Sequence, residues 1–323
     1  MKKILWVLKW LFIFIVVVLV LTSIYEQYAR YSSKKNFIDN GTYVKVDGHK
    51  MHYVQKGVGT PTVIFESGLD FAGHMSWYKV QNEISKLTTT ISYDRAGILR
   101  SEKSHKARTC ENMADEVHIL LEKTEAKKPY IFVAHSMGGL IARCYAKKYA
   151  DSLGGIVFVD ATHPKQMERA SEVMKAKMKA ATNSSNWMGA FLFNSGIARI
   201  GLNDLLPNFI NDKQNIEAIK SEINAYLIKS NEGVLEEGRM LEQMLQASKD
   251  VSFGDIPFIN LSANGKPSNE DERVFFEMFR KLQEESLTSS TNSKLIAVDS
   301  GHYIQIEKPE VVIEAIKEMV ENI

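Results

Sequence analysis

At its centre the chain reads Tyr130-Ile131-Phe132-Val133-Ala134-His135-Ser136-Met137-Gly138-Gly139-Leu140. An apolar run rich in strand-forming residues ends abruptly at Ser136, and a helix-compatible run over residues 140–149 follows. A serine between small residues at a strand-to-helix turn is the nucleophile-elbow pattern, which holds the serine Oγ clear of the backbone. Ala134 takes the first small position, where glycine is usual, and adds only a methyl group. The stretch predicts a central strand that ends in a nucleophilic serine.

Length, charge and composition limit what the chain can be. Its 323 residues are enough for one large α/β domain or two smaller ones, with a substantial core. Lys and Arg (40) nearly balance Asp and Glu (39), so no global field attracts nucleic acid. We find no zinc, phosphate-loop or dinucleotide motif and expect neither a metal nor a cofactor. The two cysteines, Cys110 and Cys144, form no metal-ligand spacing and no disulfide framework, and we expect Cys144 to be a small buried apolar residue.

The first thirty residues predict a membrane anchor. Residues 4–24 are apolar except for Lys9 and two hydroxyl residues, and a helix of that length matches a hydrocarbon core of about 30 Å. A cleavable signal peptide is the alternative, but no Ala-x-Ala-like site follows Leu21. We expect residues 1–30 to be an uncleaved, single-pass anchor in the cell membrane. A slight excess of positive charge on the amino-terminal side places the large domain outside the cytoplasm.

Strand-like and helix-like segments alternate beyond a polar spacer at residues 31–41. Strands are expected at residues 42–46, 51–55, 62–65, 88–93, 130–134, 156–159, 257–261 and 294–298. Helices are expected at residues 77–87, 110–124, 140–149 and 309–322. The alternation predicts an α/β fold with a mainly parallel sheet flanked by helices, formed by residues 42–162 and 255–323.

Residues 163–254 interrupt this alternation. They show no clear strand pattern, but helical spacing at residues 167–179, 214–228 and 234–247. An insertion of this length is too long for a simple crossover, so we expect a helical cap over the carboxyl edge of the sheet. Its most apolar patch is Trp187, Met188, Phe191, Leu192 and Phe193. These side chains either form the cap's own core or line an apolar substrate pocket.

A serine hydroxyl becomes nucleophilic only when a base removes its proton. His302 follows the last predicted strand, which puts it at the same edge of the sheet as Ser136. His135 adjoins the serine, cannot easily aim its ring at the same Oγ, and is expected to pack beside the elbow. A carboxylate should orient the base. Asp160, at the end of the neighbouring strand, is the first candidate, and Glu270 or Asp271 after the strand at 257–261 are the alternatives.

The oxyanion of a tetrahedral intermediate needs preorganised backbone donors. Met137, the residue after the nucleophile, is expected to supply one N–H group. Gly68 follows the strand at residues 62–65 and allows the backbone to approach a substrate closely. The N–H of Leu69 is therefore the expected second donor.

From about Thr42 onwards the chain resembles the α/β-hydrolase family. The segments that carry the resemblance occur in the family's order, at residues 46–53, 65–68, 92–97, 134–138, 158–164 and 301–303. The resemblance implies that residues 92–97 form a structural loop beside the site, in which we expect Asp94 and Arg95 to form an ion pair. Two departures are Ser67 where many members have histidine, and the lack of a Gly-x-x-Asp arrangement after residues 257–261. The second departure favours Asp160.

These observations predict a membrane-anchored serine hydrolase with the α/β-hydrolase fold, acting on a small-molecule ester or lipid with an apolar acyl group. Its expected triad is Ser136, His302 and Asp160, and its oxyanion hole the N–H groups of Leu69 and Met137. Epoxide hydrolase and haloalkane dehalogenase relatives need a carboxylate where this chain has serine. The alternatives are an aminopeptidase-like member, which would use a cap carboxylate to hold a substrate amine, and a non-catalytic binding protein on the same scaffold.

Overall fold

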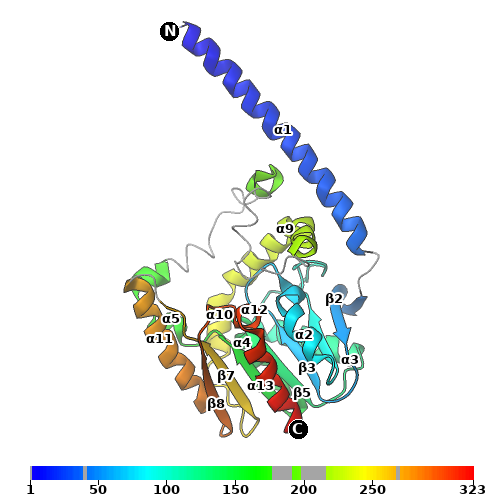
Figure 1. Ribbon diagram of the computed structural model, residues 1–323, viewed down its shortest axis with the longest axis vertical. Helices are drawn as coiled ribbons and strands as arrows, with labels where there is room; N and C mark the ends of the chain where they lie inside the picture. The colour runs from blue at the N-terminus through cyan, green and yellow to red at the C-terminus, as the bar shows by residue number, and fades with distance from the viewer. Residues whose placement is uncertain (1, 39–41, 177–190, 198–215, 267–269) are drawn as a thin grey trace.

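The computed structural model of the protein describes residues 2–38, 42–176, 191–197, 216–266 and 270–323 (Figure 1). Its centre is an eight-stranded sheet in the order β1-β2-β4-β3-β5-β6-β7-β8. The first two pairings are antiparallel and those from β4 to β8 are parallel, which confirms the predicted, mainly parallel sheet. The strands are β1 (Thr42–Val46), β2 (His49–Lys56), β3 (Thr62–Glu66), β4 (Thr90–Tyr93), β5 (Tyr130–His135), β6 (Leu153–Val159), β7 (Phe258–Ala263) and β8 (Ser293–Val298).

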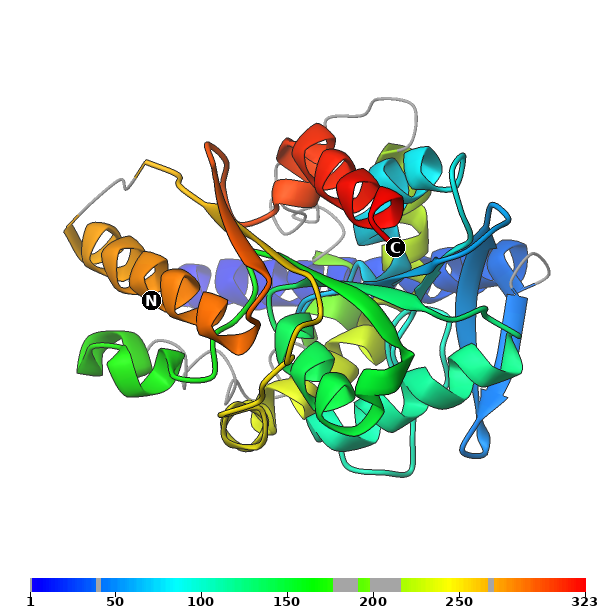
Figure 2. The ribbon, with the colours of Figure 1, turned by 90° about the horizontal axis from the view of Figure 1, so that it is seen from below.

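Helices cover both faces of the sheet (Figure 2). One face packs against α3 (Cys110–Lys123), α4 (Gly138–Tyr149) and α10 (Leu241–Ala247), and the other against α2 (Tyr78–Ile84) and α13 (Pro309–Glu321). Because side chains alternate along a strand, Phe132 of β5 joins the first core and Val133 the second. Every residue of β5 is buried, which explains why its sequence is an unbroken apolar run up to His135.

The described elements between β6 and β7 are helical. They are α5 (Gln166–Arg169), α9 (Ile216–Arg239) and α10. Two separate helical segments were expected, at 214–228 and 234–247, whereas α9 continues from the first into the second as far as Arg239, and α10 follows after Met240. Of the predicted apolar patch, Phe191, Leu192 and Phe193 belong to a short described segment, and Trp187 and Met188 lie outside the described residues.

The amino-terminal helix α1 (Lys2–Ile38) is continuous and projects away from the sheet (Figure 1). Its residues 2–35 are long and apolar enough to cross a membrane and contain an 18-residue window with a mean hydropathy of 3.0, properties that signal sequences share. The predicted spacer at residues 31–41 is therefore helical as far as Ile38. The end of α1 packs against α9, where Ser221 Oγ lies 3.4 Å from Ser33 Oγ and the Lys34 ammonium group lies 5.6 Å from the centre of the Tyr226 ring.

Cys110 and Cys144 form a disulfide, and the expectation of no disulfide is wrong. Cys110 begins α3 and Cys144 lies in α4, and both are buried, as expected for Cys144. Two cysteines 34 residues apart carry no spacing signal of their own. The packing of α3 against α4 on one face of the sheet brings them together, and the bond links the two helices covalently.

Candidate active site

Ser136 occupies a tight turn between β5 and α4. Its φ is +52°, in the left-handed region that residues with side chains rarely adopt. The chain packs closely around this turn, because a Cβ on Gly138 would lie 2.9 Å from the backbone oxygen of Glu66, and one on Gly139 would lie 2.6 Å from the Cβ of Ala161. The small residues of the motif therefore allow the strained turn that puts Ser136 at the carboxyl edge of the sheet.

Ser136, His302 and Asp160 lie in one hydrogen-bonded line. His302, in the loop between β8 and α12 (Ile304–Glu307), has Nε2 3.0 Å from Ser136 Oγ and Nδ1 2.6 Å from Asp160 Oδ2. The other oxygen of Asp160, Oδ1, accepts a hydrogen bond from the N–H of Ala263 at 2.9 Å. Glu270 is exposed and paired with Arg273 at the start of α11 (Glu270–Ser286), and the side chain of Asp271 lies outside the described part of the structure.

The loop after β3, which contains Gly68 and Leu69, lies directly against the turn at Ser136. A Cβ on Gly68 would lie 3.0 Å from the Cβ of Ser136. Within the described residues, neither the N–H of Leu69 nor that of Met137 donates a hydrogen bond to another protein group. Met137 also precedes the first turn of α4, where the helix dipole favours negative charge. Both N–H groups are therefore free to bind an anionic oxygen.

His135 supports the loop that carries His302. Its Nε2 lies 3.0 Å from the backbone oxygen of His302, so the neutral ring donates its proton there. Burial, reinforced by nearby His302, holds the pKa of His135 well below its ordinary value. A neutral ring that faces a carbonyl does not compete for the serine proton, which agrees with the expectation that His135 packs beside the elbow.

Asp70, which the sequence analysis did not single out, follows Leu69. Its Oδ1 accepts a hydrogen bond from the N–H of Ala72 at 2.8 Å, and its Oδ2 is buried without a partner in the described structure. Burial raises the pKa of Asp70 to about 6. A carboxylic acid next to the proposed oxyanion donor thus titrates near neutral pH.

Arg95 joins three parts of the chain, and the expected ion pair between Asp94 and Arg95 is wrong. Its guanidinium group lies 2.7 Å from Glu66 Oε1 and contacts Glu237 of α9 through two hydrogen bonds of 2.8 Å. It also donates to the backbone oxygens of Ser67 and Gly68, at 2.7 and 2.6 Å. Arg95 therefore fixes the loop before Leu69 and ties α9 to it.

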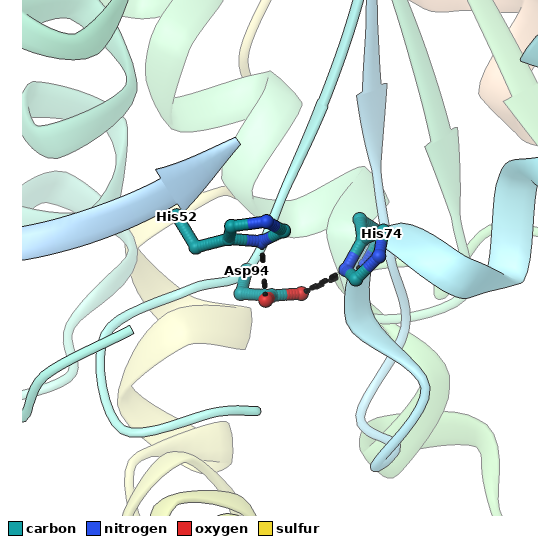
Figure 3. A group of neighbouring side chains, drawn as sticks. All are labelled: His52, His74 and Asp94. Atoms are coloured by element: carbon teal, nitrogen blue, oxygen red, sulfur yellow. Dashed lines mark hydrogen bonds and ion pairs between the residues drawn. The ribbon is translucent and has the colours of Figure 1, made fainter. Parts of the chain in front are cut away.

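Asp94 instead binds two histidines (Figure 3). Its Oδ2 lies 2.9 Å from His52 Nδ1 and its Oδ1 2.8 Å from His74 Nδ1, while the backbone N–H groups of His74 and Arg100 donate to the same oxygens. Burial alone would raise the pKa of Asp94, but the two histidines outweigh it and hold the pKa far below its usual range.

Two described groups are compact enough to be considered as metal sites. In the first, His52, His74 and Asp94, both carboxylate oxygens already accept hydrogen bonds from N–H donors. The second contains Cys110 and Cys144, whose sulfur atoms are joined in the disulfide. Neither group therefore presents a set of unengaged ligand atoms, and His52, His74 and Asp94 form a buried hydrogen-bonded cluster at the base of the loop after β4.

A cavity of about 250 Å³ opens on Ser136. One side is formed by three phenylalanines of α11 that the sequence analysis missed, although their spacing of three and four residues along a helix was a usable signal. The lining residues are Ser136, Asp160, Thr162, Gln166, Ala263, Phe275, Phe276, Phe279 and His302. The aromatic side of the pocket thus comes from α11, outside the predicted cap, and within the described lining the predicted cap contributes Gln166 of α5.

The comparisons with known proteins agree with this architecture. A family model described as "alpha/beta hydrolase fold" matches residues 61–203. The uncharacterized protein YbdG of Bacillus subtilis is 33% identical over 170 residues, which cover 51% of this chain and 52% of that protein. The chain likewise spans about half the length of other curated relatives, with 44% and 46% of two of them covered.

Two solved structures share the fold over most of the chain. The epoxide hydrolase CorEH is 19% identical with a TM-score of 0.66, covering 87% of this chain and 98% of that one. An esterase from Thermogutta terrifontis is 20% identical with a TM-score of 0.60, again covering 87% and 98%. The family-model match over residues 61–203, the sheet order and the strand-to-helix turn at Ser136 lead to one conclusion: the chain has the α/β-hydrolase fold.

Proposed function

We propose that the protein is a serine hydrolase that cleaves carboxylic esters of apolar acyl groups through an acyl-enzyme. The observation that carries the proposal is the position of His302, whose two ring nitrogens lie 3.0 Å from Ser136 Oγ and 2.6 Å from Asp160 Oδ2. A ring held between a hydroxyl and a carboxylate is the arrangement that activates a serine.

The reaction follows from this geometry. Ser136 Oγ attacks the ester carbonyl carbon while its proton passes to His302 Nε2, and Asp160 stabilises the imidazolium that forms. The N–H groups of Leu69 and Met137 bind the oxyanion. The imidazolium then protonates the departing alkoxide, so the alcohol leaves and Ser136 is acylated. His302 next removes a proton from water, and the water oxygen attacks the acyl carbonyl carbon. His302 then returns this proton to Ser136 Oγ, which releases the carboxylic acid and restores the free serine.

The lining of the cavity favours an apolar ester over an aminopeptidase substrate. Phe275, Phe276 and Phe279 offer an apolar surface to an acyl chain. Among the described lining residues the only carboxylate is Asp160, and its oxygens are engaged by His302 and Ala263. A substrate amine would find no unengaged carboxylate on this wall. A serine at the elbow likewise does not supply the carboxylate nucleophile that an epoxide hydrolase mechanism requires.

We also propose that α1 anchors the protein in the cell membrane with residues 42–323 outside the cytoplasm, and that residues 163–254 act as the cap. The exposed apolar side chains of α1 and its continuation into the contact with α9 support an anchor that is retained. The disulfide between Cys110 and Cys144 supports the orientation, because disulfides persist in oxidising compartments. Alkylation of the unreduced, denatured protein should leave both cysteines unmodified, and modification of both would count against this location.

A fluorophosphonate probe tests the enzyme proposal directly. The full chain, solubilised in detergent, should be labelled stoichiometrically, and Ser136→Ala should not be labelled while it keeps the melting temperature of the wild type. The matched control is Ser67→Ala, a serine near the site that should remain labelled. Absence of labelling on folded wild type would favour the non-catalytic binding protein.

A further inference from the structure

Arg143 of α4 is a buried cation that forms no ion pair within the described residues. It is 3% exposed, and its Nη1 and Nη2 donate to the hydroxyl oxygens of Ser289 and Ser286, at 2.9 and 3.4 Å. Its Nε–H is buried and has no partner in the described structure. The guanidinium group also lies 5.3 and 5.2 Å from the ring centres of Phe158 and Phe253. Burial lowers the pKa of Arg143 to about 10.

The other buried arginines of the described residues differ from Arg143 in having a carboxylate partner. Arg30, Arg95 and Arg108 each form an ion pair with a carboxylate, at 2.8, 2.7 and 2.8 Å. Desolvation of a charge is costly unless an opposite charge and hydrogen bonds compensate for it. Two serine hydroxyls and two aromatic rings compensate Arg143 only in part, because cation–π contacts and neutral acceptors are weaker than an ion pair.

Arg143 lines a cavity of about 410 Å³ whose wall carries further donors. Lys165 adds an ammonium group, and Lys249 adds a second one that forms an ion pair with Glu168. The backbone N–H of Lys165 donates to His163 Nδ1 at 3.1 Å, so the neutral His163 ring carries its proton on Nε2. Glu285 is paired with Arg169 at 2.9 Å, which leaves Asp250 as the other acidic side chain in the lining. The full lining is Arg143, His163, Pro164, Lys165, Lys249, Asp250, Val251, Ser252, Glu285, Thr288 and Ser289.

We propose that this cavity is a second ligand site, which binds the phosphate or carboxylate group of an organic anion with Arg143 as its counter-ion. A guanidinium fork matches either group in a bidentate geometry. The cavity volume falls in the range of small-molecule sites and exceeds what a bare inorganic anion needs. This inference is independent of the proposed function.

The site adjoins the catalytic cavity through one segment. Asp160, Thr162 and Gln166 line the cavity at Ser136, whereas His163, Pro164 and Lys165 line the cavity at Arg143. Residues 160–166, which follow β6, thus contribute to the lining of both cavities. An anion bound at Arg143 would contact the same loop that holds Asp160 in place.

Thermal unfolding of the detergent-solubilised full chain tests the proposal. The probes are inorganic phosphate, glycerol 3-phosphate, hexanoate and short-chain phosphatidic acid, each compared with sodium chloride at equal ionic strength. We expect at least one organic anion to raise the melting temperature by about 5 °C or more at a concentration near 100 times its Kd. A rise with glycerol 3-phosphate identifies a soluble ligand, and a rise only with phosphatidic acid identifies a lipid headgroup. A rise with hexanoate, which is also a product acid of the proposed esterase, supports this site only if Arg143→Met removes it.

Substitutions separate a ligand site from a structural arginine. Arg143→Met, which keeps the volume and removes the charge, should melt at or above the wild-type temperature without ligand and should lose the response to anions. Lys165→Gln, on the more exposed wall, should fold normally and weaken the response. Arg108→Met is the matched control, because it leaves Glu116 buried and unpaired and should lower the melting temperature without removing the response. No anion-specific rise in the wild type, or an equal rise in Arg143→Met and Lys165→Gln, would overturn the proposal.

Discussion

Replacement of Asp160 by asparagine is the most informative perturbation of the proposed triad. The N–H of Ala263 donates to Oδ1 of Asp160, so in the variant the amide must turn its oxygen towards Ala263. The amide NH₂ group then faces His302 Nδ1, in place of the oxygen that lies 2.6 Å away in the wild type. Nδ1 must therefore accept a hydrogen bond, which puts the ring proton on Nε2.

This tautomer cannot take the proton of Ser136, because Nε2 is already protonated. The same substitution in serine proteases reduces kcat about 10⁴-fold, equivalent to about 5.5 kcal/mol of transition-state stabilisation. We expect a loss of the same order in the hydrolysis of p-nitrophenyl esters at pH 7.5, with KM changed little. The unfolding temperature should change by only a few degrees, because asparagine keeps the shape of the side chain and can still accept the hydrogen bond from the N–H of Ala263.

Asp299→Asn is the matched control, since Asp299 lies in the same loop as His302 and forms no hydrogen bond with its ring in the described structure. It should retain activity within a few-fold of the wild type. Turnover by Asp160→Asn within tenfold of the wild type would refute the reasoning and would transfer the orienting role to Glu270 or Asp271.

Three further substitutions test other parts of the site. Phe276→Ala should lower kcat/KM for an octanoate ester about tenfold more than for an acetate ester, because the longer acyl chain loses apolar contact. Val274→Ala, at an exposed position of the same helix, should not discriminate between the two esters. Equal losses for both esters in Phe276→Ala would contradict an acyl-binding wall. Glu237→Gln should lower the free energy of unfolding by about 3 kcal/mol and reduce kcat about tenfold, because Arg95 loses a fully buried carboxylate partner. Glu232→Gln, in an exposed pair with Lys103 on the same helix, should cost under about 1 kcal/mol, and similar effects of the two would refute a special role of Glu237. Because the pKa of Asp70 is raised, the folded protein binds more protons than the unfolded chain between about pH 4 and 6, and its stability falls as the pH rises. In chemical unfolding, Asp70→Asn should remove this slope and should be more stable than the wild type above pH 6 by about 2–3 kcal/mol. An unchanged slope would contradict the assignment to Asp70.

The features predictable from the sequence are those encoded by short runs of residues. The elbow needs a strand, a serine and small neighbours within a few positions, and the parallel topology brings the ends of β3, β5, β6 and β8 to one edge of the sheet. Local pattern and strand order were therefore enough to bring Ser136, His302 and Asp160 into one group of candidates.

The features that the sequence did not predict depend on contacts between distant segments. Arg95 pairs with Glu66 and with Glu237, which is 142 residues away and reaches Arg95 only because α9 docks there. The disulfide depends in the same way on how α3 meets α4. The phenylalanines of α11 have a helical spacing, but which cavity they line is decided by where α11 lies beside β7. A single sequence does not show which distant segments come into contact.

The continuous α1 has a mechanical consequence for the proposed anchored enzyme. Because no described break separates the apolar segment from the contact at Ser33, the catalytic domain is joined to the anchor by a rigid rod rather than a tether. From Ile24 to Ser33 the rod is about 14 Å long, at a rise of ~1.5 Å per residue. The domain would thus be held at a set height and tilt above the bilayer, with the α9 side nearest the lipid headgroups.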